Sequence, residues 1–384
     1  MPPVSTSVED ELAATNVLSL LTIVAKVGSS SLTTESGEVD QRAIERVGDQ
    51  VALLRAEGHR VVVVSSGAVA AGLEALGLGA KRPADALTLQ AVSAVGQSRL
   101  MRVWDDTLGA HGIVSGQVLL VPNDFFDRTQ YLHARDTLGR LLDLGVVPIV
   151  NENDALADDE LRFGDNDRIA ALLSHLVGAD VLVLLTDTAG LYTADPRTDP
   201  AARLIETVDE VTPELEALAG GTGTSRGSGG MASKVRAAKI ASWSGVRAVI
   251  AASASPTGLL DAVRNVPGAG TSVRAHDRKL SARKLWIAFA VDVGGRVVVD
   301  DGARTALIER GVSLLPAGVR GVEGTFDEGD AIELAGPDGR VFARGLTRYS
   351  SADALGVAGK RSAELADEAP SVLVHRDDLV LLPG

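Results

Sequence analysis

The sequence predicts an α/β protein, in which helices cover both faces of a mostly parallel sheet, followed by a small β-barrel-like domain. Short unbroken apolar runs alternate with segments of helical periodicity, as expected for strands buried on both faces. The chain has 384 residues, enough for two domains. From about residue 285 the apolar runs become shorter and are separated by turn residues, which indicates a second, β-rich unit.

The composition limits the compartment and the partners. A net charge of -14 argues against a general binder of nucleic acid or membrane surfaces. The absence of cysteine excludes disulfides, thiolate metal ligands and a cysteine nucleophile, and it fits a reducing compartment. No apolar run reaches the ~18 residues of a membrane span. Acidic residues at 9–11 stand where a signal peptide needs positive charge. We therefore expect a cytoplasmic protein whose residues 1–19 form a disordered extension.

The densest polar region surrounds residues 146–177. A buried strand over 146–150 leads into residues 151–154, and residues 165–167 open a helix with apolar residues at helical spacing. These two segments contain seven carboxylate and amide side chains. One of them could be a simple helix cap. Burying all seven would cost desolvation unless they bind something polar, so we predict a ligand or metal site here, with the metal ligands left open.

The first two strands each end in small residues. A strand over 20–24 leads into residues 26–31, where backbone N–H groups could approach an anion and Lys26 supplies a charge. Asp40 caps a helix that ends at Gly58. A strand over 61–64 is followed by residues 65–67, which open another helix and suit an anionic ligand. Taken singly, such a segment could equally be a tight strand-to-helix turn.

The remaining elements of this half continue the alternation. A long helix over 85–109 carries an apolar stripe that indicates core or oligomer contact, formed by Leu87, Ala91, Ala94, Val95 and Met101. The strand over 180–185 ends in Thr186 and Asp187, and the glycine-rich residues 220–230 precede a helix that carries Lys234. The other predicted elements are a strand over 117–121, a helix over 128–144 and a strand over 247–251.

Polar groups thus follow four different strands, at residues 26–31, 65–67, 151–154 and 186–187. Open α/β sheets bind ligands at the carboxyl ends of their strands, so the four groups together predict one site. We assign residues 20–270 to this catalytic domain, 271–284 to a linker and 285–384 to the β-rich domain, which begins with a strand over 285–291.

Glycine loops and two loop lysines indicate phosphate handling, although the usual P-loop pattern is missing. Residues 227–232 match a dinucleotide-binding pattern, but they do not follow a strand and no acidic residue stands near 250, which disfavours a dehydrogenase. RNA binding by the C-terminal domain is a further alternative. Acidic residues outnumber basic ones there, so nucleic acid is not an expected partner.

Several motifs together resemble the glutamate 5-kinase branch of the amino acid kinase family over residues 20–265, and the C-terminal part resembles its PUA domain. The kinase motifs are residues 26–30, 65–68, 151–154, 164–167, 186–193 and 229–234; those of the PUA domain are 311–316, 329–330, 343–345 and 374–378. The resemblance implies ATP- and Mg²⁺-dependent phosphorylation of the side-chain carboxylate of L-glutamate to L-glutamyl 5-phosphate, the first step of proline biosynthesis. Another acyl-phosphate-forming kinase, such as an aspartate kinase, is the alternative.

The same resemblance implies the roles of individual residues. Lys26 and Lys234 would flank the transferring phosphoryl group, with Asp167 orienting both. Glutamate would be bound by Ser66, Asp154 and Asn166, and Asp154 would meet its ammonium group. The resemblance also implies a homo-oligomer and feedback inhibition by proline. ATP would be bound by Lys26, Thr186, Asp187, Ser228, Gly229, Gly230, Met231, Ala232, Ser233 and Lys234.

Overall fold

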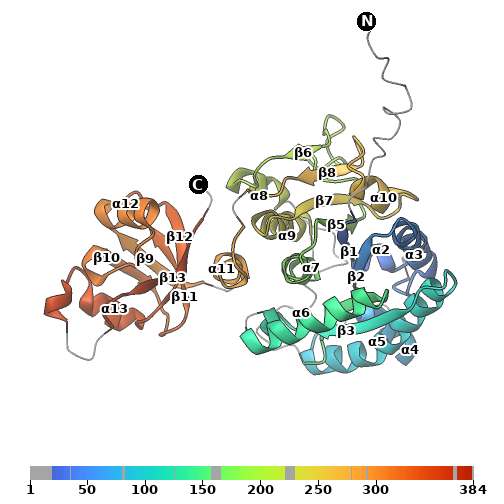
Figure 1. The fold of residues 1–384 in the computed structure, drawn as a ribbon, viewed down its shortest axis with the longest axis horizontal. Coiled ribbons are helices and arrows are strands. Elements are labelled where there is room, and N and C mark those ends of the chain that lie inside the picture. The colour runs from blue at the N-terminus through green and yellow to red at the C-terminus, as the bar shows by residue number, and fades with distance from the viewer. Residues whose placement is uncertain are drawn as a thin grey trace, which may run out of the picture.

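The computed structural model describes residues 20–34, 36–79, 83–125, 127–156, 166–220, 230–277, 279–290, 293–365 and 370–382. The predicted extension over residues 1–19 lies outside these. Eight strands form the larger sheet in the order β3-β4-β2-β1-β5-β7-β8-β6, and helices lie on both of its faces (Figure 1). Every pairing is parallel except that of β7 with β8, which confirms the predicted fold class. Its strands are β1 (Thr22–Val27), β2 (Arg60–Ser65), β3 (Ser115–Leu120), β4 (Val147–Glu152), β5 (Val181–Thr186), β6 (Thr207–Val208), β7 (Arg247–Ala252) and β8 (Gly270–Val273).

Strand alternation divides the core into two layers. Successive side chains of a strand point to opposite faces, so in β1 the side chain of Val24 packs on one face and those of Ile23 and Ala25 on the other. The Val24 face is covered by α6 (Arg128–Asp143), α7 (Asn166–Leu176), α8 (Pro213–Ala219) and α9 (Met231–Trp243). The opposite face is covered by α2 (Ser29–Leu32), α3 (Gln41–Ala56), α4 (Ala68–Leu76), α5 (Ala86–Gly109) and α10 (Gly258–Val263).

The helices α4 and α5 cross at two glycines. A Cβ on Gly96 would stand 1.7 Å from the carbonyl oxygen of Ala68, and one on Gly72 would stand 1.9 Å from that of Val92. Only glycine permits so close an approach of two helix backbones. The crossing therefore fixes α5 against the start of α4, which directly follows the carboxyl end of β2.

The buried face of α5 differs from the predicted stripe. Leu87 and Val95 are 79% and 38% exposed, so the core interpretation of the stripe is wrong. Burial of the opposite face follows from the glycine crossing, which turns Gly96 and its helical neighbours inward. The buried apolar residues of α5 are Leu89, Val92, Leu100, Trp104 and Leu108.

The segment after β8 is folded onto the large sheet. The predicted linker began at residue 271, whereas β8 pairs with β7 up to Val273, so the sheet extends further than we expected. The backbone N–H of His276 donates to the carbonyl of Ser242 at 2.9 Å, and the ring of His276 stacks on Trp243 with centroids 4.1 Å apart. This contact joins the segment to the end of α9.

The strand predicted over 285–291 is wrong for residues 285–290, and residue 291 lies outside the described residues. The structure has instead a short helix α11 (Ala282–Leu285), continued by one π-helical turn over Trp286–Ala290. A short apolar run does not distinguish a strand from a buried helix by periodicity alone. Ser281 before a run of good helix formers was the missed start signal.

The C-terminal part forms a separate five-stranded sheet in the order β10-β9-β11-β12-β13, seen to one side of the large sheet in Figure 1. Its apolar core is its own and includes Val297, Leu334 and Phe342. Among the described residues no helix has both the length and the apolarity required to cross a membrane. The elements are β9 (Val293–Val299), α12 (Asp301–Arg310), β10 (Val319–Gly324), β11 (Ala331–Ala335), β12 (Val341–Thr347), α13 (Ser351–Val357) and β13 (Val374–Leu381).

We predict that Gly96→Ala lowers the free energy of unfolding by roughly 2–3 kcal/mol or more, because the new methyl group overlaps the backbone of α4. The matched control is Gly109→Ala in the same helix, where a Cβ meets nothing within 4 Å. That change should alter stability by no more than about 1 kcal/mol. Urea denaturation measures the stability of both variants. Equal unfolding midpoints would contradict the prediction that close packing at Gly96 requires a glycine.

Candidate active site

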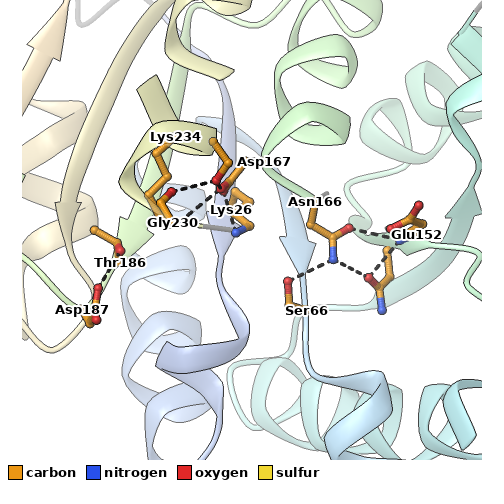
Figure 2. A network of polar contacts seen from close by, with 11 residues as sticks. Lys26, Ser66, Glu152, Asn166, Asp167, Thr186, Asp187, Gly230 and Lys234 are labelled. Atoms are coloured by element: carbon orange, nitrogen blue, oxygen red, sulfur yellow. Dashed lines mark hydrogen bonds and ion pairs between the residues drawn. The ribbon is translucent and has the colours of Figure 1, made fainter. Parts of the chain in front are cut away.

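Two lysines and one aspartate form a buried cluster at the carboxyl edge of the large sheet, which we call the charge cluster: Lys26, Asp167 and Lys234. The ammonium nitrogen of Lys26 lies 2.6 Å from Oδ1 of Asp167, and that of Lys234 lies 3.3 Å from Oδ2. All three residues are at most 4% exposed. Figure 2 shows both ammonium groups converging on the carboxylate. The structure thus brings together three residues that the sequence places far apart.

Local structure explains how each member reaches the cluster. Lys26 lies two residues after Val24 in β1, so its side chain points to the face covered by α7 and α9. Asp167 is in the first turn of α7 and Lys234 in the first turns of α9. A Cβ on Gly28 would stand 3.3 Å from the Lys26 ammonium, so a glycine there leaves room for it.

The surroundings of Asp167 keep it ionised. Burial raises its pKa, but the charges of Lys26 and Lys234, with hydrogen bonds from Lys26 and Ser233, outweigh burial and hold the pKa of Asp167 well below its ordinary range. The Ser233 hydroxyl oxygen lies 2.6 Å from Oδ2. Because the folded pKa is below the unfolded value, ionisation of Asp167 stabilises the protein above about pH 4, and this contribution is lost as the pH falls through the folded pKa.

A second group, the amide network, lies beside the charge cluster and consists of Asn166, Asn151, Gln97 and Ser66. The amide nitrogen of Asn166 donates to the Ser66 hydroxyl at 3.0 Å and to Oδ1 of Asn151 at 2.9 Å. Oδ1 of Asn166 accepts from the backbone N–H of Glu152 at 3.2 Å. Since Asn166 and Asp167 are consecutive at the start of α7, one helix end serves both groups (Figure 2).

The two serines after β2 have different surroundings. Ser66 joins the amide network, whereas the Ser65 hydroxyl accepts a hydrogen bond from Nε1 of Trp104 at 2.8 Å. Ser65 therefore anchors α5 to the sheet. Ser66 is the residue that we selected from the sequence, and the structure places it in the candidate site.

Sequence reasoning missed two residues of α5. The Ser93 hydroxyl donates to Oδ2 of Asp154 at 2.8 Å. Gln97 donates to the carbonyl of Glu152 at 3.3 Å and accepts from the amide of Asn151 at 3.2 Å. The sequence did contain a sign of this role, because Ser93 and Gln97 are polar residues one helical turn apart and so lie on the same face of the helix. We had interpreted that helix only as core or oligomer contact.

On the other side of the charge cluster lies a cavity of about 190 Å³, which we call the donor cavity. The Thr186 hydroxyl donates to Oδ1 of Asp187 at 3.0 Å within it. Met231 lines it, but Ser228 and Gly229 lie outside the described residues, as does Asp165. The described residues that line it are Ser30, Thr186, Asp187, Thr188, Gly190, Leu191, Tyr192, Ala194, Asp195, Pro196, Arg197, Leu218, Ala219, Gly230, Met231 and Lys234.

The order of these groups follows the order of the strands. Neighbouring strands β5, β1, β2 and β4 end in Thr186, Val27, Ser65 and Glu152. Figure 2 accordingly shows Thr186 and Asp187 to one side, the charge cluster in the middle, and Ser66 with Asn166 on the other side. The site therefore has two polar halves separated by two ammonium groups.

Within the described part of the chain, no three Asp, Glu or His side chains gather in an arrangement that could hold a metal ion. Among the described residues that line the donor cavity, Asp187 and Asp195 carry carboxylates. Asp195 is engaged by the Arg197 guanidinium through contacts of 3.0 and 2.8 Å, which leaves Asp187 as the better candidate ligand.

Comparison with known proteins gives two family matches. The model of the amino acid kinase family matches residues 21–252, and that of the PUA domain matches residues 295–368. The glutamate 5-kinase of Burkholderia multivorans is 47% identical over 364 residues, covering 94% of this chain and 97% of that protein. The glutamate 5-kinase of Myxococcus xanthus is 47% identical over 368 residues, covering 94% and 96%. A solved structure of carbamate kinase from Giardia lamblia bound to AMP-PNP aligns with a TM-score of 0.48 at 17% identity, over 67% of this chain and 99% of that one.

We predict that Asp167→Ala lowers the free energy of unfolding by roughly 3–5 kcal/mol, because it leaves two buried ammonium groups without their carboxylate. The control is Asp143→Ala, which breaks an exposed ion pair with Arg60 at 2.7 Å. The control should cost less than about 1 kcal/mol. Denaturant unfolding at pH 7 compares the variants; similar losses would show that the charge cluster does not hold the core together.

Proposed function

Because this chain belongs to the glutamate 5-kinase branch of the amino acid kinase family, we propose that it transfers the γ-phosphoryl group of ATP to the side-chain carboxylate of L-glutamate. The product is L-glutamyl 5-phosphate, an acyl phosphate, and ADP leaves. The acceptor oxygen forms a bond to phosphorus while the bond between phosphorus and the β,γ-bridging oxygen breaks. This reaction is the first step of proline biosynthesis.

One observation carries the mechanism: the charge cluster lies between two polar halves along adjacent strands (Figure 2). We assign the donor cavity to ATP and the amide network, with Asp154, to glutamate. In phosphoryl transfer the donor and acceptor oxygens lie on opposite sides of the phosphorus, and charge spreads over its other oxygens. Two ammonium groups between the halves suit that arrangement, since they would neutralise this charge.

The acceptor needs no general base. A glutamate side chain has an ordinary pKa of ~4.3 and is already a carboxylate at neutral pH. The buried His59 and the half-buried His175 are also far from this chemistry. His59 precedes the first residue of β2, and His175 is in the last turn of α7. Catalysis then depends on positioning and on charge neutralisation.

Asp167 has a positioning role in this proposal. Its carboxylate contacts Lys26 and Lys234 through different oxygens, so each ammonium group has a fixed place. Its depressed pKa means that it does not accept a proton during turnover at neutral pH. We assign catalysis to Lys26 and Lys234, which would contact the phosphoryl oxygens.

The acceptor half offers a carboxylate for the substrate ammonium. Asp154 is buried and held by Ser93, while Ser66 and Asn166 present a hydroxyl and an amide. We propose that Asp154 binds the α-ammonium group of glutamate and that Ser66 and Asn166 complete its recognition. Aspartate is shorter by one methylene group, so with its ammonium group on Asp154 its side-chain carboxylate would stop short of the place that the glutamate carboxylate reaches. This difference in length favours glutamate over the alternative of an aspartate kinase.

We propose that Mg²⁺ enters as the Mg-ATP complex. Magnesium is commonly held by one or two carboxylates together with substrate phosphates and water. Asp187, in the donor cavity, fits as the protein ligand. The ion would supply further neutralisation of phosphate charge.

Three further proposals are a cytoplasmic location, which the composition favours, and feedback inhibition by proline and a homo-oligomer, which the family resemblance implies. Exposed apolar side chains on α5, such as Leu87 and Val95, support the last of these, because a second copy could cover them. We also propose that phosphoryl transfer belongs to residues 20–273 alone. Every assigned site residue precedes the C-terminal sheet.

We predict that the protein with Mg-ATP and L-glutamate forms an acyl phosphate that hydroxylamine traps as a hydroxamate. The expected result is glutamate-dependent hydroxamate, with ADP formed in equal amount. A reaction with aspartate in place of glutamate would transfer the assignment to the alternative. No nucleotide turnover with either amino acid would refute the proposed function.

We predict that Lys234→Ala and Asp154→Ala have different kinetic effects. Removing a preorganised cation of the transition state should lower kcat by on the order of 100- to 1000-fold, with the KM for glutamate nearly unchanged. Asp154→Ala should mainly raise the KM for glutamate, because it removes binding of one substrate. Lys239→Ala is the matched control, since Lys239 is in the same helix and pairs with Glu216 at 2.9 Å.

Steady-state kinetics with each substrate varied in turn decide this prediction. A Lys234→Ala enzyme whose kcat stays within about threefold of the parent, a barrier change of only ~0.65 kcal/mol, would remove Lys234 from the mechanism. Loss of activity in Lys239→Ala would indicate that any change in α9 is harmful.

A further inference from the structure

We propose that Ser93 is a positioning residue of the acceptor site, which sets the affinity for glutamate by holding the carboxylate of Asp154. This inference rests on the proposed function of Asp154 as the ligand of the substrate ammonium. It adds α5 to the site, although none of the six kinase motifs named in the sequence includes this part of the helix.

The contact joins two groups that are both withdrawn from solvent. Ser93 is 1% exposed and Asp154 is 7% exposed, and the hydroxyl donates to Oδ2 at 2.8 Å. A hydrogen bond to an ionised acceptor is among the stronger ones in proteins, and in a buried place it is not exchanged for water. The bond therefore restrains the orientation of the carboxylate.

The position of Ser93 results from the glycine crossing of α4 and α5. Gly96 lies within contact distance of the α4 backbone, and Ser93 is one helical turn before it, so both face inward. Asp154 follows β4 at the carboxyl edge of the sheet. With any larger residue at 96, α5 would stand further from α4, and the hydroxyl would be withdrawn from Asp154.

Gln97 extends the same support to the amide network. It is 9% exposed, and its side chain bridges the carbonyl of Glu152 and the amide of Asn151. Asn151 in turn accepts from Asn166. One turn of α5 thus supports both parts of the acceptor half, while no residue of α5 lines the donor cavity. A defect at Ser93 should consequently affect glutamate and leave ATP unaffected.

The test is steady-state kinetics of Ser93→Ala with glutamate and ATP varied separately. We expect the KM for glutamate to rise by on the order of tenfold, the effect of losing one hydrogen bond to a charged group. The kcat and the KM for ATP should stay within about twofold of the parent. A KM for glutamate within twofold of the parent would overturn the inference.

Two serines serve as controls for the same chemical change. Ser98→Ala removes an exposed hydroxyl five residues further along α5, and Ser174→Ala removes a fully buried hydroxyl that donates to its own helix at 2.7 Å. Both should keep the parental KM for glutamate. A rise in KM for either control equal to that of Ser93→Ala would show a general effect of lost hydroxyl groups and would also overturn the inference.

A double-mutant cycle separates positioning from mere stability. If Ser93 acts through Asp154, Ser93→Ala should leave the KM for glutamate unchanged in an Asp154→Ala background. Additive effects would overturn the inference. Failure of the proposed function has a different signature, because the parent enzyme would then show no glutamate-dependent turnover at all.

Discussion

The interaction on which this structure depends is the buried ion cluster of Asp167 with Lys26 and Lys234. A carboxylate between the two buried ammonium groups offsets part of the cost of withdrawing them from water, and it contacts each through its own oxygen. The three residues come from β1, α7 and α9, so the cluster also ties one face of the sheet to the two helices above it. The residues that we assign to the neutralisation of phosphate charge are therefore also buried in the interior of the domain.

The arrangement along the sheet edge connects this cluster to the reaction. Parallel strands bring their carboxyl ends together, and the order of β5, β1, β2 and β4 gives a donor half, a cationic centre and an acceptor half. The first two residues of α7 serve different parts of the site: Asn166 joins the amide network of the acceptor half, and Asp167 joins the charge cluster at the centre. Binding of one substrate and neutralisation of the transferred group are therefore linked through a single helix end.

The opposite face of the sheet contributes through close packing. Glycines at 72 and 96 allow α4 and α5 to touch backbone to backbone, and this contact directs Ser93 and Gln97 toward the residues that end β4. The charged residues of the sequence do not indicate this supporting role, because Ser93 and Gln97 are uncharged. It depends on the distance between two helices, which a single methyl group would change.

The sequence by itself determined the parallel α/β fold and the carboxyl-edge location of the site, because apolar runs and the polar residues that follow them are local features of the chain. It also singled out Lys26, Ser66, Asn166, Asp167 and Lys234, all of which the structure places in the charge cluster or the amide network. Only the tertiary structure decided which face of α5 is buried, that residues 285–290 form helical turns, and that Ser93 contacts Asp154. These outcomes depend on contacts between segments distant in the chain, and periodicity within one segment does not encode them.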